Sequence, residues 1–405
     1  MLSPESKEIV KATLPVIGAA IDDITPIFYR RMFAAHPELE RDLFNRGNQA
    51  QGTQQRALAA SIAAYATLLV DDSSPDPREV LPRIAHKHAS LGIRPDQYPI
   101  VHEHLFAAIV EVLGDAVTPE IAAAWNEVYW DMAETLVDIE RDLYAGAGVE
   151  VGDVWRQLVV RHRTQEGPDT VGFTMASPDG TALPAPKPGQ YVSVAIRLAD
   201  GARQIRQYTV TRVNDADAIG FSVKRVVELA TPDGVVPAGE VSNHLHDNVF
   251  EGDLIEVSAP FGELTLTDTD SPLMLISAGI GVTPMIGFLN FLHRTGSTRE
   301  VHVLHADRTP ARHAHRADLK ELCAALPNAS LHRWYENLGT REAHEFLRTG
   351  LIDLEHIELP EGADVYLCGP IPFMGSVRSS LRTRGVPDAQ IHYEIFGPSQ
   401  DLEWA

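Results

Sequence analysis

Cysteine is nearly absent from this sequence. The 405 residues include only Cys323 and Cys368. Two thiols cannot form a disulfide framework or a four-thiolate metal centre, and such scarcity is typical of proteins that work in a reducing compartment. We therefore expect a cytoplasmic protein.

Long apolar runs and an excess of basic residues are also missing. No stretch approaches the ~20 apolar residues of a membrane span, and the start, MLSPESKEIV, lacks the basic and apolar regions of a secretory signal. Lysine and arginine number 34 against 56 aspartates and glutamates, a net charge of −22. That charge disfavours nucleic acid and anionic membranes as partners, so we expect neither nucleic-acid binding nor stable membrane association.

What is present is the composition of a globular protein with several domains. Apolar residues make up 44% of the chain and charged residues 22%. The length suggests about two or three domains. We find no internal repeat and no low-complexity tract.

Residues 1–145 have the pattern of successive helices and no convincing strand. Within residues 48–70, an apolar stripe at helical spacing is formed by Leu58, Ile62, Tyr65 and Leu69. Similar stripes follow residues 98 and 121. Breaks are expected at 71–77 and 92–95, where proline joins other turn-forming residues.

The pattern changes after AGAG (145–148), which reads as a linker. Short β-rich runs at 155–161, 191–196, 207–211, 221–227 and 254–258 predict an antiparallel sheet or barrel. Strands at 273–277, 300–305 and 364–368 then alternate with helices near 283–293 and 318–326, which predicts a doubly wound parallel sheet. We expect a multidomain protein with an all-α domain (1–147), an antiparallel β-barrel domain (151–266) and an α/β doubly wound domain (270–405).

The strongest local signal is SAGIGVTPM at 277–285, between an expected strand and an expected helix. Its glycines let the backbone approach a ligand, Pro284 suits a first helical turn, and free N–H groups at the helix start suit a pyrophosphate. It lacks the full GxGxxG pattern, so a plain strand-to-helix turn is the alternative. A later strand ends in YLCGP (366–370), at the edge where such sheets bind ligands, although Cys368 alone could be a buried small hydrophobe.

Two motifs in the barrel region suggest a second ligand. In RQYT (206–209), Arg206 and Tyr208 share a strand face, and a guanidinium beside an aromatic suits a flavin and its phosphate. A cross-strand pair on the barrel surface is the alternative. In GEVSNHL (239–245), we expect Ser242 or Asn243 to be a helix N-cap and a further phosphate cradle.

In this order, the motifs resemble the ferredoxin-reductase-like flavoproteins. The matching motifs are KPGQY (187–191), RQYT (206–209), VSN (241–243), SAGIGVTPM (277–285), YLCGP (366–370) and YEIFGP (393–398). The resemblance implies FAD at Tyr191, Arg206, Gln207, Tyr208, Thr209, Val241, Ser242 and Phe396. It implies NADH or NADPH at Gly279, Ile280, Gly281, Val282, Thr283, Pro284, Cys368, Gly369 and Pro370.

This sequence departs from the reductase pattern in places. Residues 225–240 do not align residue by residue, so their flavin contacts are open. Val282 stands where relatives often carry a polar residue. The choice of nucleotide is also open, because Arg308 could meet a 2′-phosphate whereas Asp307 could favour a free ribose hydroxyl.

The helical region contains a histidine pair, His86 and His88, in IAHKH (84–88). A haem iron needs one imidazole on an otherwise apolar wall. Residues two apart on a helix do not share a face, so at most one of the two can be a ligand. A surface histidine pair is the alternative.

Residues 1–145 resemble the globin module of the flavohaemoglobins. The matching strings are KATLPVI (11–17), FYRRMF (28–33), HPEL (36–39), LFNRGNQ (43–49), IAAYA (62–66), KHASLGI (87–93) and PDQYPIVHEHL (95–105). The resemblance implies haem b with His88 as the proximal iron ligand, oriented by Tyr98 and Glu140. It places Tyr29, Gln54, Phe44 and Leu58 on the distal side. It makes Lys87 and Glu394 a redox-tuning pair between haem and flavin, and it leaves His86 at the surface.

Together the two resemblances imply a monomeric nitric oxide dioxygenase. NAD(P)H would reduce FAD, FAD would reduce the haem, and dioxygen and nitric oxide would be converted to nitrate. One alternative is a flavin or hydroperoxide reductase for which the haem is only an electron acceptor. Another is an oxygen or nitric oxide sensor or store, which would not need a dedicated electron supply.

Overall fold

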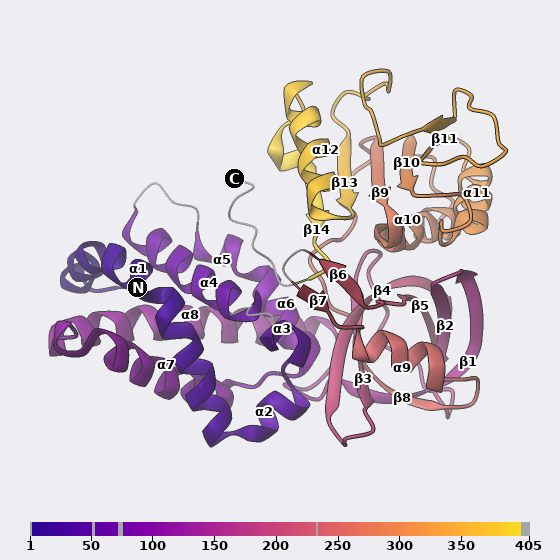
Figure 1. The fold of residues 1–405 in the computed structure, drawn as a ribbon. Coiled ribbons are helices and arrows are strands. Elements are labelled where there is room, and N and C mark those ends of the chain that lie inside the picture. The colour runs from indigo at the N-terminus through magenta and orange to yellow at the C-terminus, as the bar shows by residue number, and fades with distance from the viewer. Residues whose placement is uncertain (1, 51–52, 72–75, 232–233, 398–405) are drawn as a thin grey trace. The chain divides into compact units, whose positions relative to one another are not determined.

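The structure is a computed structural model that describes residues 2–50, 53–71, 76–231 and 234–397. Contacts divide the chain into two compact units. Unit 1 comprises Met1–Arg156, Ala195–Arg206 and Pro398–Ala405, and unit 2 comprises Gln157–Val194 and Gln207–Gly397. Figure 1 shows their helices and strands in order along the chain.

Unit 1 begins with helices, as the sequence predicts. They are α1 (Pro4–Ala35), α2 (Pro37–Asp42), α3 (Arg46–Ala50), α4 (Thr53–Val70), α5 (Pro77–Val80), α6 (Pro82–Leu91), α7 (Tyr98–Leu113) and α8 (Pro119–Gly146), with 3-10 turns η1 (Pro95–Gln97) and η2 (Gly114–Ala116). Among the described residues before 155, none belongs to a strand. The prediction of an all-helical N-terminal region is confirmed for the part of it that the structure describes.

Local chemistry explains where α6 ends. The helix stops at Gly92, whose φ of 77° lies in the left-handed region that favours glycine. A Cβ at Gly92 would lie 2.9 Å from the carbonyl oxygen of Gly152. Conformation and space therefore both require glycine here, one turn after His88.

The core of unit 1 forms where α1 packs against α4, α7 and α8. Its fully or almost fully buried members include Val10, Phe28, Met32, Tyr65, Ala85, Ala108, Ala124 and Val128. Phe44 and Leu58 are partly buried against the same core. The apolar stripes of the sequence thus converge on one cluster, because residues three and four apart share a helix face.

A closed antiparallel barrel follows, in the order β1-β2-β5-β4-β3-β8. Its strands are β1 (Trp155–Gly167), β2 (Thr170–Ala176), β3 (Tyr191–Arg197), β4 (Arg203–Asp215), β5 (Ala218–Lys224) and β8 (Leu254–Ser258). The barrel region also contains the pair β6 (Leu229–Thr231) and β7 (Gly234–Val236) and the helix α9 (Glu240–Asn248). The expected barrel is confirmed, and β8 has the predicted bounds.

Several strand bounds predicted from the sequence differ from the structure: β1 extends to Gly167 and β4 spans Arg203–Asp215, beyond the expected 155–161 and 207–211. The expected strand at 221–227 ends at Lys224. Backbone groups of Val226 are bound by the start of α9: its N–H donates to Ser242 Oγ at 3.2 Å, and its carbonyl accepts from Gly239 N–H at 2.9 Å. Because both groups of Val226 are used in this way, they cannot join the barrel ladder.

The C-terminal part of unit 2 is a six-stranded parallel sheet in the order β12-β11-β10-β9-β13-β14. Its strands are β9 (Leu273–Ala278), β10 (Val301–Asp307), β11 (Ala329–Tyr335), β12 (Leu347–Thr349), β13 (Asp364–Cys368) and β14 (Ile391–Glu394). The turns η3 (Gly279–Gly281) and η4 (Asp388–Gln390) and the helices α10 (Val282–Arg294), α11 (Arg316–Ala325) and α12 (Ile371–Thr383) connect them. The predicted doubly wound sheet is confirmed.

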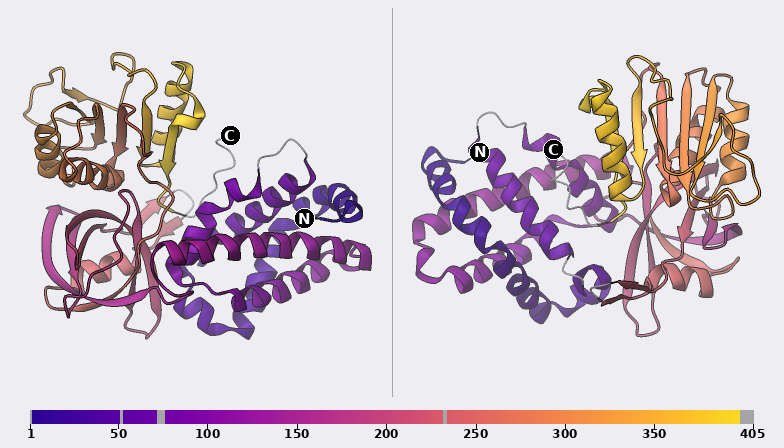
Figure 2. Two further views of the ribbon diagram at one scale, coloured as in Figure 1. Left: turned by 180° about the vertical axis from the view of Figure 1, so that it is seen from behind. Right: turned by 45° about the horizontal axis from the view of Figure 1, so that its top comes forward.

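The strand order creates a switch point at the centre of this sheet. After β9 the chain moves to β10 and β11, whereas after β13 it moves the opposite way to β14. Right-handed crossovers then put α10 and α11 on one face of the sheet and α12 on the other, as Figure 2 shows. Ligands of such sheets bind where the carboxyl ends of the two central strands diverge, here after Ala278 and Cys368.

A stacked pair of buried histidines supports the segment after β10. The rings of His305 and His313 lie 3.9 Å apart, centroid to centroid. His305 Nδ1 contacts Ser277 Oγ at 2.9 Å, and His313 Nδ1 contacts the Tyr335 hydroxyl at 2.7 Å. Burial lowers the pKa of His305, while burial and the charge of His305 lower that of His313. Both rings are therefore neutral at neutral pH.

This pair predicts that unit 2 loses stability in mild acid. The folded pKa of each ring lies below the unfolded value of 6.5, so the unfolded chain binds protons first as the pH falls. The free energy of unfolding should decrease below pH 6.5 by up to about 1.4 kcal/mol per pH unit for each ring. In denaturation experiments, the free energy of unfolding of His313→Gln should depend less steeply on pH than that of the wild type. His162→Gln changes an exposed histidine of the barrel and should match the wild type. Equal slopes of the free energy of unfolding against pH in the wild type and both variants would contradict the prediction.

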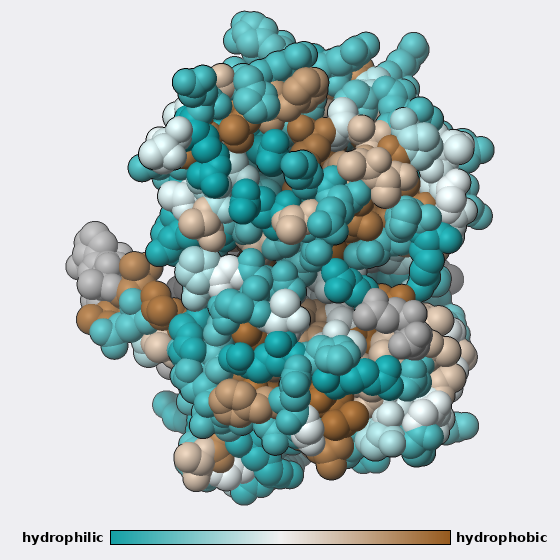
Figure 3. Space-filling model, turned by 90° about the vertical axis from the view of Figure 1, so that its right-hand side faces the viewer, coloured by the Kyte–Doolittle hydropathy of each residue, from teal (hydrophilic) through white to brown (hydrophobic). Residues whose placement is uncertain are grey.

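The surface of unit 2 is mostly polar. The face in Figure 3 is largely hydrophilic, with apolar side chains in small groups between polar ones. Within the described part of the chain, no helix is both long and apolar enough to cross a membrane.

Candidate functional site

Three residues from three helices meet around one imidazole in unit 1. His88 Nδ1 lies 2.8 Å from Glu140 Oε1 and 3.1 Å from the Tyr98 hydroxyl oxygen. The Tyr98 hydroxyl donates to Glu140 Oε1 at 2.6 Å. An ionised carboxylate only accepts hydrogen bonds, so Nδ1 of His88 carries the proton and donates it to Glu140. This leaves the lone pair of Nε2 available, with no hydrogen-bond partner among the described residues.

Because two members of this group are buried, the charge of one strongly affects the protonation of the other. Glu140 is 2% exposed and Tyr98 is 8% exposed. Burial, and then the negative charge of Glu140, raise the pKa of Tyr98, so its phenol remains protonated and continues to donate. A buried carboxylate is costly without partners, and His88 and Tyr98 supply them.

The surrounding helices hold these side chains in place. The Tyr129 hydroxyl donates to the carbonyl of Tyr98 at 2.7 Å, at the start of α7. The Tyr144 hydroxyl of α8 donates to the carbonyl of Ile93 at 2.6 Å, just after α6. On α6 itself, His86 is half-buried and Lys87 is exposed. His88 is thus the histidine of the pair whose Nδ1 is bound by Glu140.

A second aromatic group carries the predicted distal residues. The Tyr29 ring lies 5.9 Å from that of Phe44 in an edge-on arrangement. Tyr29 is 4% exposed, and burial raises its pKa. Leu58 packs against the same core. Gln54 belongs to α4, but its side chain lies outside the described residues.

Gln49 was missed by the sequence-based prediction. Its side chain is a neighbour of Tyr29 and partly opposes the rise in that residue's pKa. The residue is 9% exposed, and neither atom of its amide has a hydrogen-bond partner among the described residues. A buried amide without a protein partner usually pairs with a bound water or ligand. The only sequence signal was its place at the end of the LFNRGNQ string.

These residues fit a haem. His88 offers an Nε2 lone pair while Nδ1 is bound to Glu140, the arrangement that orients and strengthens an imidazole ligand. The orphaned Gln49 amide and the buried Tyr29 phenol are polar groups that an iron ligand could pair with. Phe44 and Leu58 add apolar side chains that pack against the same core.

In unit 2, two predicted nucleotide segments meet at the switch point of the sheet. Ser277 pairs with Cys368 across β9 and β13, so the segments that follow are adjacent. A Cβ at Gly281 would lie 2.3 Å from the carbonyl oxygen of Cys368 and 2.8 Å from the backbone nitrogen of Gly369. Gly281 therefore allows η3 to touch the end of β13, which leaves the start of α10 facing the open edge.

The remaining residues of this motif are shaped for backbone contact. Gly279 has a φ of 56°, and a Cβ there would meet nothing within 4 Å. Val282, Thr283 and Pro284 are buried in the first turn of α10, and Ile280 is partly exposed. Burial raises the pKa of the Cys368 thiol well above its usual value. Cys368 is thus a buried neutral thiol, followed by the partly or fully exposed pair Gly369 and Pro370.

Strand β4 carries the predicted flavin residues Arg206, Gln207, Tyr208 and Thr209. Gln207 Nε2 donates to Ser193 Oγ at 2.8 Å, and Tyr208 stacks on Phe221 at 5.5 Å between centroids. Tyr191 pairs with Phe261 in an isolated bridge. A Cβ at Gly262 would lie 3.1 Å from the Tyr191 ring. The glycine lets the chain pass close to that aromatic face.

The predicted N-cap of α9 is wrong. The helix begins at Glu240 with Gly239 as N-cap, so Ser242 and Asn243 lie inside its first turns. Ser242 Oγ instead bonds the N–H of Val226 and the carbonyl of Gly239. Its neighbour Val241 is buried. Ser242 therefore closes the loop before α9 through its side chain and is not the cap.

The remaining residues that the sequence singled out lie in different elements of the fold. Phe396 is 47% exposed. Glu394 ends β14 beside Cys368 in register, and Lys87 belongs to the other unit. The N–H of Arg308 donates to Asp307 Oδ1 at 2.7 Å after β10.

Comparisons with known proteins agree with both halves of the chain. The globin family profile matches residues 27–136, and the oxidoreductase NAD-binding domain profile matches residues 275–379. A flavohemoprotein of Rhizobium meliloti is 40% identical over an alignment of 407 residues that covers 98% of this chain and 99% of that protein.

Two solved structures are similar as well. The crystal structure of a flavohemoglobin from Malassezia yamatoensis with bound FAD and heme is 38% identical, with a TM-score of 0.87, and the match covers 98% of this chain and 100% of that one. The flavohem-like FAD/NAD binding domain of a nitric oxide dioxygenase from Vibrio cholerae is 33% identical, with a TM-score of 0.54 over 60% of this chain and 99% of that one.

Fold, site and similarity lead to one family. The chain has a helical globin region, an antiparallel barrel and a doubly wound nucleotide-binding sheet in the expected order. With 40% identity to a curated relative over nearly its whole length, this oxidoreductase belongs to the flavohemoprotein family.

Proposed function

We propose that this chain is an NAD(P)H-dependent nitric oxide dioxygenase that holds haem b and FAD and converts nitric oxide and dioxygen to nitrate. The observation that carries the proposal is the contact of His88 Nδ1 with Glu140 Oε1 at 2.8 Å. When bound, the haem would supply the dioxygen chemistry, and FAD with the nicotinamide would supply single electrons. We further propose the boundaries 1–147, 151–266 and 270–405 for the haem, FAD and nucleotide domains.

On the proximal side, Glu140 changes the electronic character of His88. A carboxylate that accepts the Nδ1 proton increases the electron density of the ring, which makes Nε2 a stronger donor to iron. Tyr98 donates a second hydrogen bond to the same carboxylate oxygen and holds it in place. As a strong donor to the iron, His88 would favour oxygen activation over reversible storage.

On the distal side, Tyr29 would supply a hydrogen bond. Burial raises the pKa of Tyr29, so the phenol remains a neutral donor. A preorganised donor stabilises negative charge that develops on an oxygen atom during reaction. The neighbouring amide of Gln49 would hold the phenol in orientation or donate to the same oxygen.

In unit 2, the close approach at Gly281 supports nucleotide binding. Gly281, just before the start of α10, lies against Gly369 just after β13, and a pyrophosphate would bind at this strand-to-helix turn. We place FAD along β4 and near Tyr191. Hydride would enter at this edge of the sheet, and electrons would leave one at a time.

The deciding experiment is aerobic turnover of the haem- and flavin-loaded protein. With NADH or NADPH, nitric oxide should disappear and nitrate should accumulate. Each nitrate formed from nitric oxide and dioxygen takes one electron, so one nucleotide should support two nitrates. A protein that reduces flavin or hydroperoxide but leaves nitric oxide unconsumed would refute the proposal. So would an oxygen complex that persists after nitric oxide is added in the presence of excess nucleotide.

A further inference from the structure

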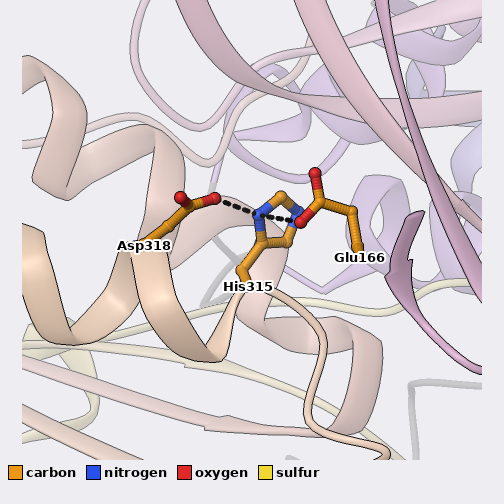
Figure 4. Close-up of side chains that lie close together, drawn as sticks. All are labelled: Glu166, His315 and Asp318. Carbon is orange, nitrogen blue, oxygen red and sulfur yellow. Dashed lines mark hydrogen bonds and ion pairs between the residues drawn. The ribbon is translucent and has the colours of Figure 1, made fainter. Parts of the chain in front are cut away.

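Unit 2 contains a cluster of one histidine and two carboxylates outside the sites described above. Glu166 lies near the end of β1 in the barrel, His315 is the N-cap of α11, and Asp318 lies in the first turn of that helix. Asp318 Oδ2 lies 2.8 Å and Glu166 Oε2 3.5 Å from His315 Nδ1. Figure 4 shows the two carboxylates flanking the imidazole. One potential ligand atom from each residue lies within 4.8 Å of the other two.

The cluster is largely removed from water. The side chain of His315 is 3% exposed, that of Glu166 is 17% and that of Asp318 is 26%. Burial raises the pKa of Glu166, whereas the His315 hydrogen bond lowers that of Asp318. Glu166 has no hydrogen bond with any described residue, and only His315 Nδ1 comes within ion-pair distance of it.

Groups outside the cluster already orient two of its members. Ser222 Oγ on β5 lies 2.8 Å from His315 Nε2. Arg212 on β4 lies 3.2 Å from Asp318 Oδ2. A metal-bound histidine commonly donates its second ring N–H to an oxygen, which fixes its tautomer. With Nε2–H donating to Ser222, loss of the Nδ1 proton would leave the lone pair of Nδ1 directed at an ion between the two carboxylates.

We propose that Glu166, His315 and Asp318 bind a zinc ion. One imidazole and two carboxylates are a ligand set that suits zinc, whereas magnesium and calcium prefer oxygen ligands throughout. Ligand atoms about 2.0–2.1 Å from a tetrahedral zinc lie roughly 3.4 Å apart, a value that the 2.8 and 3.5 Å separations bracket. Water would complete the coordination.

Bound zinc would join the barrel to the nucleotide-binding sheet. Glu166 comes from β1, whereas His315 and Asp318 come from the segment that follows β10 and from α11. The ion would replace the proton on Nδ1, so its binding releases a proton and weakens as the pH falls. This inference does not depend on the proposed function, because no residue of the cluster belongs to the haem, flavin or nucleotide sites.

The test is a calorimetric titration of the full-length, cofactor-loaded protein with zinc after treatment with a chelator. The wild type should bind one tight equivalent of zinc. His315→Asn should weaken that binding at least about 100-fold, and Ser222→Ala should weaken it about 10-fold. Asparagine tolerates the left-handed backbone at His315, where φ is 57°, so the variant should fold. Glu166→Gln, similar in shape, provides a second loss of a ligand.

Controls separate this site from other histidines. The matched control residue is His162, which faces Glu251 on the barrel surface, with both side chains mostly exposed. The His162→Asn variant should retain the tight equivalent of zinc. Magnesium and calcium should not displace zinc. X-ray absorption of the zinc-loaded wild type should show nitrogen and oxygen neighbours including one imidazole. Absence of a tight equivalent in the wild type, or wild-type zinc affinity in both His315→Asn and Glu166→Gln, would overturn the proposal and leave the cluster as an ion pair.

Discussion

Replacing His88 with alanine should remove the haem and abolish nitric oxide consumption. The Nε2 lone pair of His88 is the proposed iron ligand, and the buried Glu140 carboxylate holds its Nδ1. The absorbance of purified protein should lack the Soret band while the flavin bands remain. Reduction of ferricyanide by NADH should continue, because the nucleotide motif and the proposed flavin residues other than Arg206 lie in unit 2.

His86→Ala is the matched control for this substitution. His86 lies two residues before His88 on α6, so it points away from the Glu140 carboxylate. The His86→Ala variant should retain its haem and its turnover of nitric oxide. If His88→Ala kept a Soret band of wild-type intensity, or if His86→Ala lost it, the assignment of the proximal ligand would be wrong.

Gly281→Ala should impair nucleotide binding more than any other small substitution in the sheet motif. The new Cβ would lie 2.3 Å from the carbonyl oxygen and 2.5 Å from the carbonyl carbon of Cys368. These atoms are backbone atoms of the central strand β13, so they cannot rotate away, and η3 must move instead. Such overpacking costs about 1–3 kcal/mol. The KM for NADH should rise at least about 10-fold, with haem content unchanged.

Gly279→Ala tests whether space or conformation decides this effect. A Cβ at Gly279 would meet nothing within 4 Å, but its φ of 56° disfavours a side chain. The strain costs about 1–2 kcal/mol without displacing η3 from β13. Steady-state kinetics with NADH should therefore show a smaller rise in KM than for Gly281→Ala. The opposite order would show that the close approach to Cys368 is not what shapes the site.

The three-part fold could be predicted from the sequence because its signals are local. Apolar residues three and four apart, alternating β-rich runs and turn-forming residues each act within a few positions of one another. This is why β8 and β13 have the predicted bounds and why helices fill the described part of residues 1–145. Gly281 stood out for the same reason, since a glycine-rich turn between a strand and a helix is a local pattern.

The errors at α9 and at the end of β5 have one cause. A backbone group far away in the sequence forms a hydrogen bond with a side chain whose local role was predicted differently. Ser242 has a side chain suited to an N-cap, yet its hydroxyl accepts from Val226 N–H and so α9 begins at Glu240. The same contact ends β5 at Lys224. Competition for one hydroxyl between two segments cannot be read from either segment alone.

For this protein, the sequence by itself determined the order of helical, barrel and nucleotide-binding regions and, through its resemblances, the candidate residues. Only the tertiary structure decided which of these residues meet. His88 and Glu140 come from separate helices and form a hydrogen bond because α6 packs on α8. Gln49 became a candidate only when its amide proved to be buried without a partner. Glu166 lies beside His315 through tertiary packing. Packing depends on contacts between residues far apart in the chain, whereas secondary structure depends largely on local sequence.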